Sequence, residues 1–275
     1  MILWNDEIRP KSDVRISPDD RGYIFGDGVY EVLRIYDGRL FEKEAHLTRL
    51  ARSAAEIRLR LPAGPAEIGE RLERLVAASS VSEGILYMQI TRGEAPRTHA
   101  FPPDAKPVLM AYCNELKRNR AAMQDGIRAV TVPDIRWHRC DIKTLNLLPN
   151  VLARQEAAER GASEAILHRD GKVTECSASN IMIVKDGVIR THPADNYILH
   201  GVTRAIALKL AARLEVPVKE QAFTLEEMLA ADEVFITGTT VEITPVTEID
   251  GKPVGDPARP VTRRLQEAFA RYAGV

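Results

Sequence analysis

The chain has 275 residues, with a hydrophobic content of 45%, a charged content of 28% and a net charge of −1 at pH 7. This length and composition are typical of a folded protein with one large domain or two modest ones. The small net charge gives no reason to expect a partner that is a nucleic acid or a membrane surface.

Residues 1–117 are predicted to form strands and helices in alternation. Two β-rich runs flank Asp37-Gly38, which predicts a hairpin over residues 29–41. The spacing of apolar residues then predicts a helix over 42–61 and a second over 66–80, followed by strands over 84–93 and 106–116. The next stretch is charged and rich in small residues, and we place a domain linker at 118–120.

The remaining residues repeat this mixture. Helices are expected over 148–160 and near 201–214 and 259–272, and hairpin turns at Asp170-Gly171 and Asp186-Gly187. Strands are expected over 127–132, 164–175, 180–190, 233–238 and 242–254. Hairpins with interspersed helices predict an α+β protein with two domains, a small N-terminal α/β domain at 1–117 and a larger C-terminal domain at 121–275.

Several common site motifs are absent from the sequence. It contains no GxGxxG or GxxxxGK[ST] phosphate loop, no HExxH and no GxSxG. The three cysteines are widely spaced and form no CxxC pair, which argues against a disulfide framework or a metal site. With no signal peptide or membrane span visible at the N-terminus, we expect a protein of a reducing compartment, the cytoplasm.

One lysine is notable in "DIKTLNLLPN", residues 141–150. The chain has ten lysines against twenty-eight arginines, so where only positive charge matters it mostly uses arginine. Lysine can lose its proton near neutral pH and become a nucleophilic amine, which arginine cannot. Lys143 is therefore either an ordinary surface lysine beside a helix start or a nucleophile.

Six segments occur in an order and at spacings that resemble the fold-type IV (class IV) pyridoxal-phosphate-dependent aminotransferases. They are "DRGYIFGDGVYE", "TRGEAPRTHAFP", "RCDIKTLNLLPNVLARQEA", "VTECSASN", "LHGVTR" and "TGTTVEITPV". The resemblance covers essentially the whole chain and implies that family's two-domain fold, with pyridoxal 5′-phosphate as cofactor. "KTLNLL" and "EAILHRDGKVTE" are family-level signals, whereas "PRTHAFP" is similar to the D-specific members. These members transfer an amino group between a D-amino acid, such as D-alanine, and a 2-oxo acid, such as 2-oxoglutarate.

The resemblance also implies which residues bind the cofactor. Lys143 matches the lysine that forms a Schiff base with the cofactor aldehyde and moves a proton between the substrate Cα and the cofactor C4′. Glu175 matches the carboxylate that keeps the ring nitrogen protonated, and Arg49 matches the phosphate-binding arginine. The larger domain would be the cofactor-binding one. Further phosphate contacts are expected from Val202, Thr203 and Thr239.

Two positions depart from the family pattern. Gly238 and Cys176 stand where a serine and a glycine are commoner. Gly238 forgoes a hydroxyl contact, so the departures concern details of the cofactor site and not its presence.

The substrate carboxylate is expected to bind at Arg97, His99 and the hydroxyl of Tyr30. Arg97 and His99 are two residues apart on a proline-bounded loop, so they point the same way if the loop is extended. The planar guanidinium of arginine suits a carboxylate. In the family this loop reaches the active site of the neighbouring subunit, so the resemblance implies a homodimer that takes small amino acids and 2-oxo acids.

Two kinds of alternative remain open. One is a member of the same family with another specificity: a branched-chain L-amino acid aminotransferase, an aminodeoxychorismate lyase or an (R)-amine transaminase. The "RTH" of the carboxylate loop favours the D-specific members. The other is a non-catalytic protein with the same fold. The presence of Lys143, Glu175 and Arg49 together speaks against it, because a binding module need not keep the imine lysine.

Overall fold

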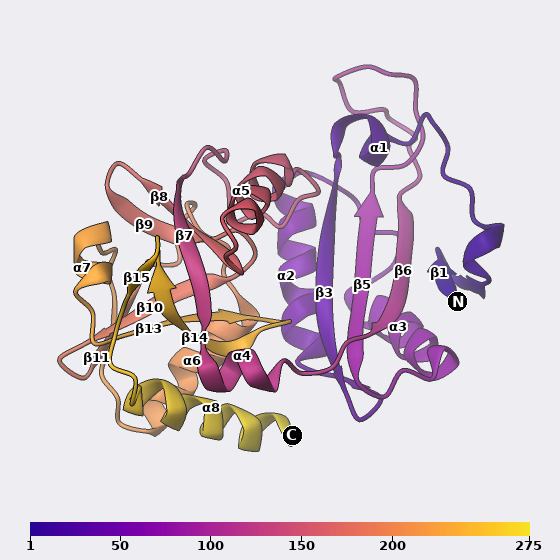
Figure 1. Cartoon of the computed structure of the whole chain (residues 1–275). Coiled ribbons are helices and arrows are strands. Elements are labelled where there is room, and N and C mark those ends of the chain that lie inside the picture. The colour runs from indigo at the N-terminus through magenta and orange to yellow at the C-terminus, as the bar shows by residue number, and fades with distance from the viewer. The chain divides into compact units, whose positions relative to one another are not determined.

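The structure is a computed structural model that describes residues 1–275, and these residues divide into two compact units (Figure 1). Unit 1 consists of Met1–Lys117 together with Ile142–Asn146, and unit 2 of Arg118–Asp141 and Leu147–Val275. The sequence predicts that residues 142–146 belong to the second domain, but they group with unit 1, because their backbone hydrogen-bonds to a strand of that unit.

The stretch expected to be a linker, 118–120, is part of unit 2. Arg120 begins helix α4 (Arg120–Asp125), and Asn119 caps that helix by accepting the N–H of Ala122. Arg118 forms an ion pair with Glu242 of the same unit. These contacts explain why the charged stretch is ordered and does not serve as a free connection.

Unit 1 contains a six-stranded sheet in the order β2-β1-β6-β5-β3-β4, with antiparallel neighbours throughout. The hairpin prediction is confirmed: Asp37 and Gly38 have φ angles of 48° and 68° and join β3 to β4. The sequence reading missed β1 and β2. The strands are β1 (Ile2–Trp4), β2 (Glu7–Arg9), β3 (Gly28–Tyr36), β4 (Arg39–Leu40), β5 (Gly84–Thr91) and β6 (Val108–Glu115).

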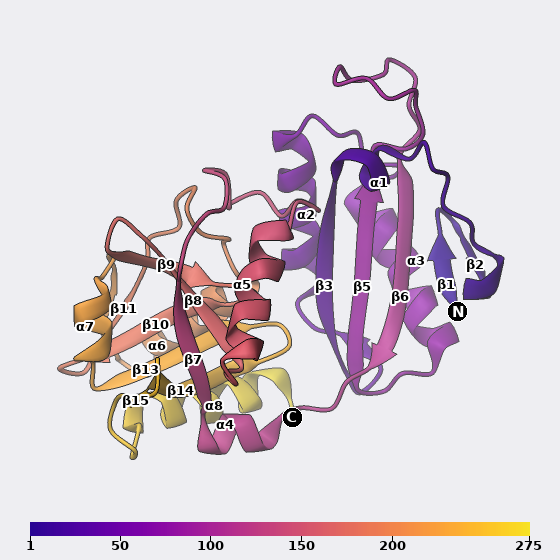
Figure 2. The same cartoon turned by 45° about the horizontal axis from the view of Figure 1, so that its top comes forward.

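Helices α2 (Lys43–Glu56) and α3 (Pro65–Ser79) cover one face of this sheet (Figures 1 and 2). Alternate strand residues such as Leu33, Leu86 and Met88 point to these helices and are fully buried. The short helices η1 (Lys11–Asp13) and α1 (Arg21–Phe25) precede β3 and were not predicted. Alternation along β3 also sends Glu31 toward α2, where it meets the candidate site described below.

Unit 2 contains a nine-stranded mixed sheet in the order β12-β11-β10-β13-β14-β7-β8-β9, with β15 paired to β14. The pairs β7–β8, β7–β14 and β11–β12 are parallel, and the other pairs are antiparallel. The end strand β9 also contacts β10, so the sheet curls. The strands are β7 (Ile127–Pro133), β8 (Glu164–Arg169), β9 (Lys172–Cys176), β10 (Asn180–Lys185), β11 (Val188–Thr191), β12 (Val218–Glu220), β13 (Glu233–Gly238), β14 (Glu242–Ile249) and β15 (Lys252–Pro253).

The predicted helices of unit 2 are present as α5 (Leu148–Glu159), α6 (Val202–Arg213) and α8 (Pro260–Ala273), whereas α4 and α7 (Leu225–Leu229) are too short to show a period. Helix α5 connects the parallel strands β7 and β8, and α6 and α8 pack on each other and on β13 and β14. The α+β class is confirmed, with parallel pairs added to the expected hairpins. None of the helices combines the length and the apolar character needed to cross a membrane.

Candidate active site

The segment that carries Lys143 runs beside the first residues of β3. The N–H of Tyr30 donates to the carbonyl of Lys143 at 3.1 Å, and the N–H of Leu145 donates to the carbonyl of Gly28 at 3.1 Å. From α2, the hydroxyl of Ser53 accepts the N–H of Lys143 at 3.2 Å. The backbone of Lys143 is therefore held from two sides, by a strand and by a helix.

The side chain of Lys143 has few contacts. Its neighbours Ile142 and Thr144 are buried, while Lys143 itself is partly exposed. Its Nζ atom lies 4.2 Å from the ring centroid of Tyr30 and has no hydrogen bond or ion pair. The Tyr30 ring stacks in turn on Tyr87, with centroids 5.9 Å apart. The structure thus presents an unpaired amine on a fixed backbone, as a nucleophile requires.

Arg49 belongs to a buried charge cluster in unit 1. Its Nε and Nη2 donate to the two carboxylate oxygens of Glu31, both at 2.8 Å, and Nδ1 of His46 lies 2.8 Å from Glu31 Oε2. Burial by itself raises the pKa of Glu31, but the charge and hydrogen bonds of Arg49 and His46 outweigh it and lower that pKa to about 2. Burial also lowers the pKa of His46, and Glu31 opposes this shift. The role of Arg49 toward a phosphate stays a prediction.

Arg97 and His99 lie on the exposed loop between β5 and β6, and both contact Phe25 of α1. The Arg97 guanidinium carbon is 5.2 Å from the Phe25 ring centroid, and the His99 ring is 5.7 Å from it. Between them, the carbonyl of Thr98 accepts a hydrogen bond of 2.6 Å from Nη1 of Arg21. The structure therefore brings the two predicted carboxylate contacts together around one aromatic ring.

The base of this loop is fixed by a carboxylate between two arginines, which the sequence reading missed. Asp27 accepts hydrogen bonds of 2.8 Å from Arg21 and of 2.8 and 3.0 Å from Arg92. Burial raises the pKa of Asp27, but the two arginines together lower it by more, so the net shift is downward. Tyr30, the third predicted carboxylate contact, has no hydrogen bond or ring contact with Arg97 in this chain and lies with Lys143 instead.

Glu175, near the end of β9, is the most heavily hydrogen-bonded of the predicted residues. Its carboxylate accepts from Nη1 of Arg136, from Nδ2 of Asn180 at 2.8 Å, and from the N–H of Leu199, which lies 3.1 Å from each oxygen. Burial raises the pKa of Glu175, and Arg136 opposes this shift. A carboxyl group of this kind can hold a proton between itself and a ligand nitrogen.

Arg136 is a second residue that the sequence reading missed. Its Nε and Nη2 donate to the two oxygens of Asp134 at 2.9 Å, and Thr174 adds a hydrogen bond of 3.0 Å to that aspartate. Burial lowers the pKa of Arg136, but Glu175 and Asp134 raise it by more. The guanidinium is thus a permanent, immobile cation behind Glu175. The stretch "DIRWHRC" contains two other charged residues, so nothing in the sequence distinguishes Arg136 from them.

Helix α6 begins without a capping side chain. Its first residues are Val202 and Thr203, Gly201 occupies the N-cap position, and the first turn contains no acidic residue. A Cβ atom on Gly201 would lie 2.1 Å from Oδ1 of Asn180, so only glycine fits there. Because Asn180 also donates to Glu175, the open amides of α6 and the Glu175 carboxylate share one neighbour.

Thr239 follows the end of β13, on the other side of Asn180. Asn180 pairs with Thr237 across strands β10 and β13, and Gly238 and Thr239 come next in the chain. The hydroxyl of Thr237 is buried and has no hydrogen-bond partner. Within unit 2 the structure therefore gathers Glu175, the start of α6 and the 237–239 segment around one asparagine.

The two departures from the family pattern are both accommodated by packing. A Cβ atom on Gly238 would lie 3.2 Å from a methyl group of Val241 and 3.4 Å from Cβ of Ser179, so a side chain would need these neighbours to shift slightly. Cys176 is buried in the hydrophobic core of unit 2, where its sulfur fills space that a glycine would leave empty.

One protein-family model matches most of the chain. Residues 28–249 match the model of the family described as amino-transferase class IV. A D-alanine aminotransferase of Listeria monocytogenes is 48% identical over 272 residues, which is 98% of this chain and 94% of that protein.

Solved structures agree with this match. The branched-chain amino acid aminotransferase of Escherichia coli superposes with a TM-score of 0.93 at 28% identity, over 99% of this chain and 94% of that chain. A second branched-chain amino acid aminotransferase, from T.th. and solved with pyridoxamine 5′-phosphate, gives a TM-score of 0.91 at 28% identity over the same shares of the two chains.

Proposed function

The chain belongs to the class IV aminotransferase family, and on this premise we propose that it transfers the amino group of a D-amino acid, such as D-alanine, to a 2-oxo acid, such as 2-oxoglutarate. The observation that carries the proposal is the geometry of Lys143. A lone amine without an ion pair, on a backbone fixed from two sides, suits a residue that must react as a base and nucleophile. A surface lysine without a function would not require a backbone that is fixed in this way.

The residues present fit pyridoxal 5′-phosphate as the cofactor. Open amides at the start of α6 and the unpartnered hydroxyl of Thr237 suit a phosphate dianion. We propose Val202, Thr203 and Thr239 as phosphate contacts on this side, together with Arg49 from unit 1. The Glu175 carboxylate is the matching group for a ring nitrogen. When bound, this cofactor supplies an electron-withdrawing ring that stabilises negative charge at the substrate Cα.

Lys143 performs the proton transfers in this proposal. Its Nζ would take the proton from the substrate Cα as an uncharged amine, and would carry that proton as an ammonium group until it is given to the cofactor side. In the second half-reaction the amine would move the proton in the opposite direction. The Tyr30 ring lies 4.2 Å from Nζ, and no carboxylate forms an ion pair with the amine.

Glu175 holds the proton at the ring nitrogen, and Arg136 holds Glu175. The carboxylate cannot rotate away, because Arg136, Asn180 and the Leu199 amide bind it from three directions. Arg136 is itself fixed by Asp134. We therefore propose Glu175 as the residue in contact with the cofactor and Arg136 as the residue that positions it.

The D-specificity is proposed to depend on where the substrate carboxylate is held. The proton enters and leaves Cα on the side where Lys143 stands, so the position of the carboxylate decides which enantiomer directs its Cα–H to the amine. Arg97 and His99, set side by side on an anchored loop, are the proposed carboxylate contacts together with Tyr30. An L-amino acid would turn its side chain to the lysine or lose these contacts.

We propose a homodimer in which the Arg97 loop serves the site of the neighbouring subunit. In this chain Tyr30 lies with Lys143, whereas Arg97 and His99 surround Phe25. A partner's loop would complete the set of three proposed carboxylate contacts. We place the enzyme in the cytoplasm, where its three free cysteines would stay reduced.

A comparison of D-alanine with L-leucine as amino donor, with 2-oxoglutarate as acceptor, tests the substrate assignment. We expect faster turnover of D-alanine. Faster turnover of L-leucine would instead assign the chain to the branched-chain specificity, which the solved structures with 28% identity share. No transamination of either donor, with cofactor bound, would favour the non-catalytic alternative.

Replacement of Arg97 tests the carboxylate contact. Arg97→Ala should raise the KM for D-alanine roughly tenfold or more, since a hydrogen bond to a charged group contributes about 1.5–3 kcal/mol. The cofactor absorbance should be unchanged. Mixing Arg97→Ala subunits with Lys143→Ala subunits should restore activity, because one site of each heterodimer has its own lysine and its partner's arginine. A mixture that is no more active at low D-alanine concentration than the two variants measured separately would show that the loop serves its own chain.

A further inference from the structure

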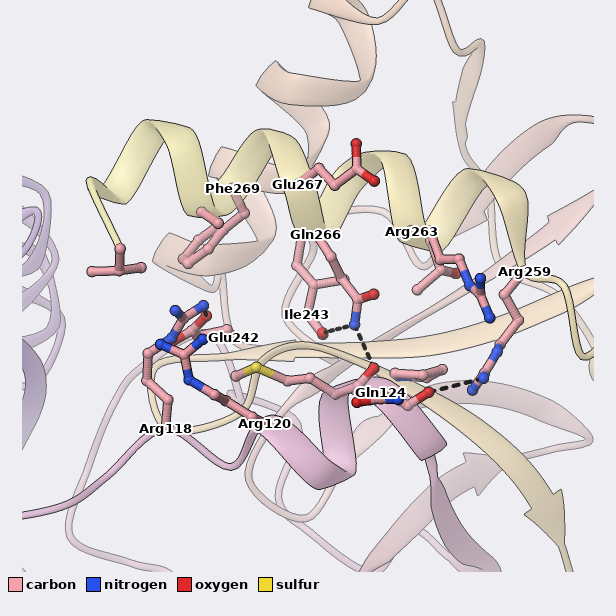
Figure 3. Close-up of a pocket in the computed structure, with 15 residues that line it drawn as sticks. Arg118, Arg120, Gln124, Glu242, Ile243, Arg259, Arg263, Gln266, Glu267 and Phe269 are labelled. Carbon is pink, nitrogen blue, oxygen red and sulfur yellow. Dashed lines mark hydrogen bonds and ion pairs between the residues drawn. The ribbon is translucent and has the colours of Figure 1, made fainter.

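A pocket of about 520 Å³ opens in unit 2 between α8 and α4, next to the start of β14 (Figure 3). This volume is typical of small-molecule sites. Four arginines and two glutamates line it, in a chain whose net charge is −1. None of its lining residues belongs to the candidate active site, so the proposed function does not explain why the pocket is cationic.

The arginines lie at the two ends of the pocket. Arg118 and Arg120, beside the start of α4, lie at one end, and Arg259 and Arg263, at the start of α8, lie at the other (Figure 3). Helix α8 rises about 15 Å between Arg259 and Phe269, which lies above the Arg118 end. The pocket is therefore elongated, with positive charge at both ends.

Two of these arginines are anchored and two are unpaired. Arg118 donates two hydrogen bonds of 2.7 Å to Glu242, and Arg259 donates to carbonyl groups at the end of α4. The side chains of Arg120 and Arg263 are exposed and make no hydrogen bond or ion pair. Each end thus combines one immobile guanidinium with one that is available to a ligand.

The wall between the two ends has apolar and polar parts. Met123 and Ile243 contribute apolar surface, Phe269 adds an aromatic ring at the Arg118 end, and the Gln266 amide donates to two backbone carbonyls. Thr262 also lines the pocket, and its hydroxyl is buried without a hydrogen-bond partner. Leaving such a group unpaired costs free energy.

We propose that this pocket binds a small elongated organic anion with a negatively charged group at each end of an apolar chain, such as an α,ω-dicarboxylate. The arginine forks bind carboxylates in planar pairs, and the apolar wall covers the methylene chain. A ligand with one charge would leave either Arg120 or Arg263 without a partner. Inorganic phosphate would not span the distance between the two ends.

Titration calorimetry on the cofactor-loaded protein at low ionic strength tests this proposal, with suberate as the probe and octanoate as its singly charged analogue. We expect suberate to bind more tightly than octanoate, and we expect the affinity for suberate to decrease when salt is added. Arg120→Gln and Arg263→Gln, one at each end, should each lower the suberate affinity about twofold to fivefold, and the double variant roughly tenfold. Arg213→Gln, an exposed arginine of the same unit outside the pocket, is the matched control and should change nothing.

A second arm separates this pocket from the substrate site. Suberate binding that persists in Arg97→Ala and falls in the Arg120→Gln/Arg263→Gln double variant supports the proposal. Binding that is lost in Arg97→Ala, or that is equal in the wild type and the double variant, overturns it. All of these arginines are exposed, so we expect each variant to fold, and thermal unfolding of each variant checks this directly.

Discussion

Lys143 and Glu175 are proposed to act on the same cofactor, yet their surroundings are opposite. The side chain of Lys143 has no hydrogen bond and contacts one aromatic ring, whereas Glu175 is buried and bound by three donor groups. The lysine must move between atoms during a turnover, and the glutamate must keep one proton at one place. In Lys143 hydrogen bonds hold the backbone and none holds the side chain, whereas in Glu175 hydrogen bonds hold the side chain itself.

Replacement of Lys143 is expected to have the largest effect on the rate, because the proposed reaction depends on its single amine. Lys143→Arg keeps a positive charge above Tyr30 but removes the amine that can be deprotonated. We expect the rate of transamination to fall by at least about 10⁴-fold, since both proton transfer and covalent catalysis are lost. Initial rates with D-alanine measure it, and an unchanged circular dichroism spectrum controls for folding. A variant within tenfold of the wild-type rate would refute the assignment.

Glu31 extends the comparison to a carboxylate that we consider structural. Glu31→Gln leaves Arg49 buried beside a neutral amide, and removing one partner of a buried ion pair costs about 3–5 kcal/mol of unfolding free energy. Urea unfolding of the purified variant measures the loss. The matched control is Glu73→Gln, which removes an exposed ion pair with Lys43 and should cost less than about 1 kcal/mol. Equal losses in the two variants would contradict the prediction.

Glu175→Gln tests the second residue of the comparison, the buried carboxylate. The amide keeps the shape of the carboxylate but removes the charge that faces the ring nitrogen, an interaction of about 2–3 kcal/mol. We expect the rate to fall roughly tenfold to a hundredfold. The cofactor absorbance spectrum should also change. Glu233→Gln, a buried carboxylate of the same unit that caps α8, is the control and should leave the rate near that of the wild type. If the activity and spectrum of Glu175→Gln both match the wild type, another residue contacts the nitrogen.

The smallest expected effect concerns acid stability. The pKa of Glu31 is about 2 in the folded protein, below its ordinary value of 4.5, so its stabilisation is present above pH 4.5 and is lost as the pH falls toward 2. The pKa of His46 is also lowered, from an ordinary value of 6.5. Below pH 6.5 the unfolded chain therefore binds a proton that the folded chain does not bind. The free energy of unfolding decreases as the pH is lowered through this range.

Replacing the histidine isolates its part of this dependence. His46→Gln should flatten the dependence of the melting temperature on pH between 6.5 and 5 and leave the steeper loss below pH 4.5 intact. Thermal unfolding in buffers across this range is the measurement. A variant whose curve parallels the wild type over the upper part of the range would show that other groups cause that part of the decline.

The sequence predicts the local features of the fold well, because their causes are local. The Asp37-Gly38 turn and the helices α2, α3, α5, α6 and α8 follow from turn chemistry and apolar spacing within a few residues. The parallel pairing of β7 with β8 and the grouping of residues 142–146 with unit 1 depend on contacts between distant segments. No pattern within either segment encodes these pairings.

The candidate site shows the same division. Lys143, Glu175 and the start of α6 could be predicted as site residues from the sequence because short motifs contain them. Arg136, the partner of Glu175, lies thirty-nine positions away along the chain. Its importance comes from burial and from the carboxylates that surround it, which appear only in three dimensions. The partner of Arg49 was missed for the same reason, since Glu31 is one of many glutamates until β3 and α2 are brought together.

The return of residues 142–146 to unit 1 has a consequence for synthesis on the ribosome. The first 117 residues emerge before the segment that completes the free edge at the start of β3, and Lys143 emerges some 25 residues after them. At usual translation rates the delay is roughly 1–5 s. During that interval Gly28 and Tyr30 expose backbone groups that the segment later pairs. The nascent N-terminal unit is therefore prone to recruit a foreign strand until the segment with Lys143 arrives to cover that edge.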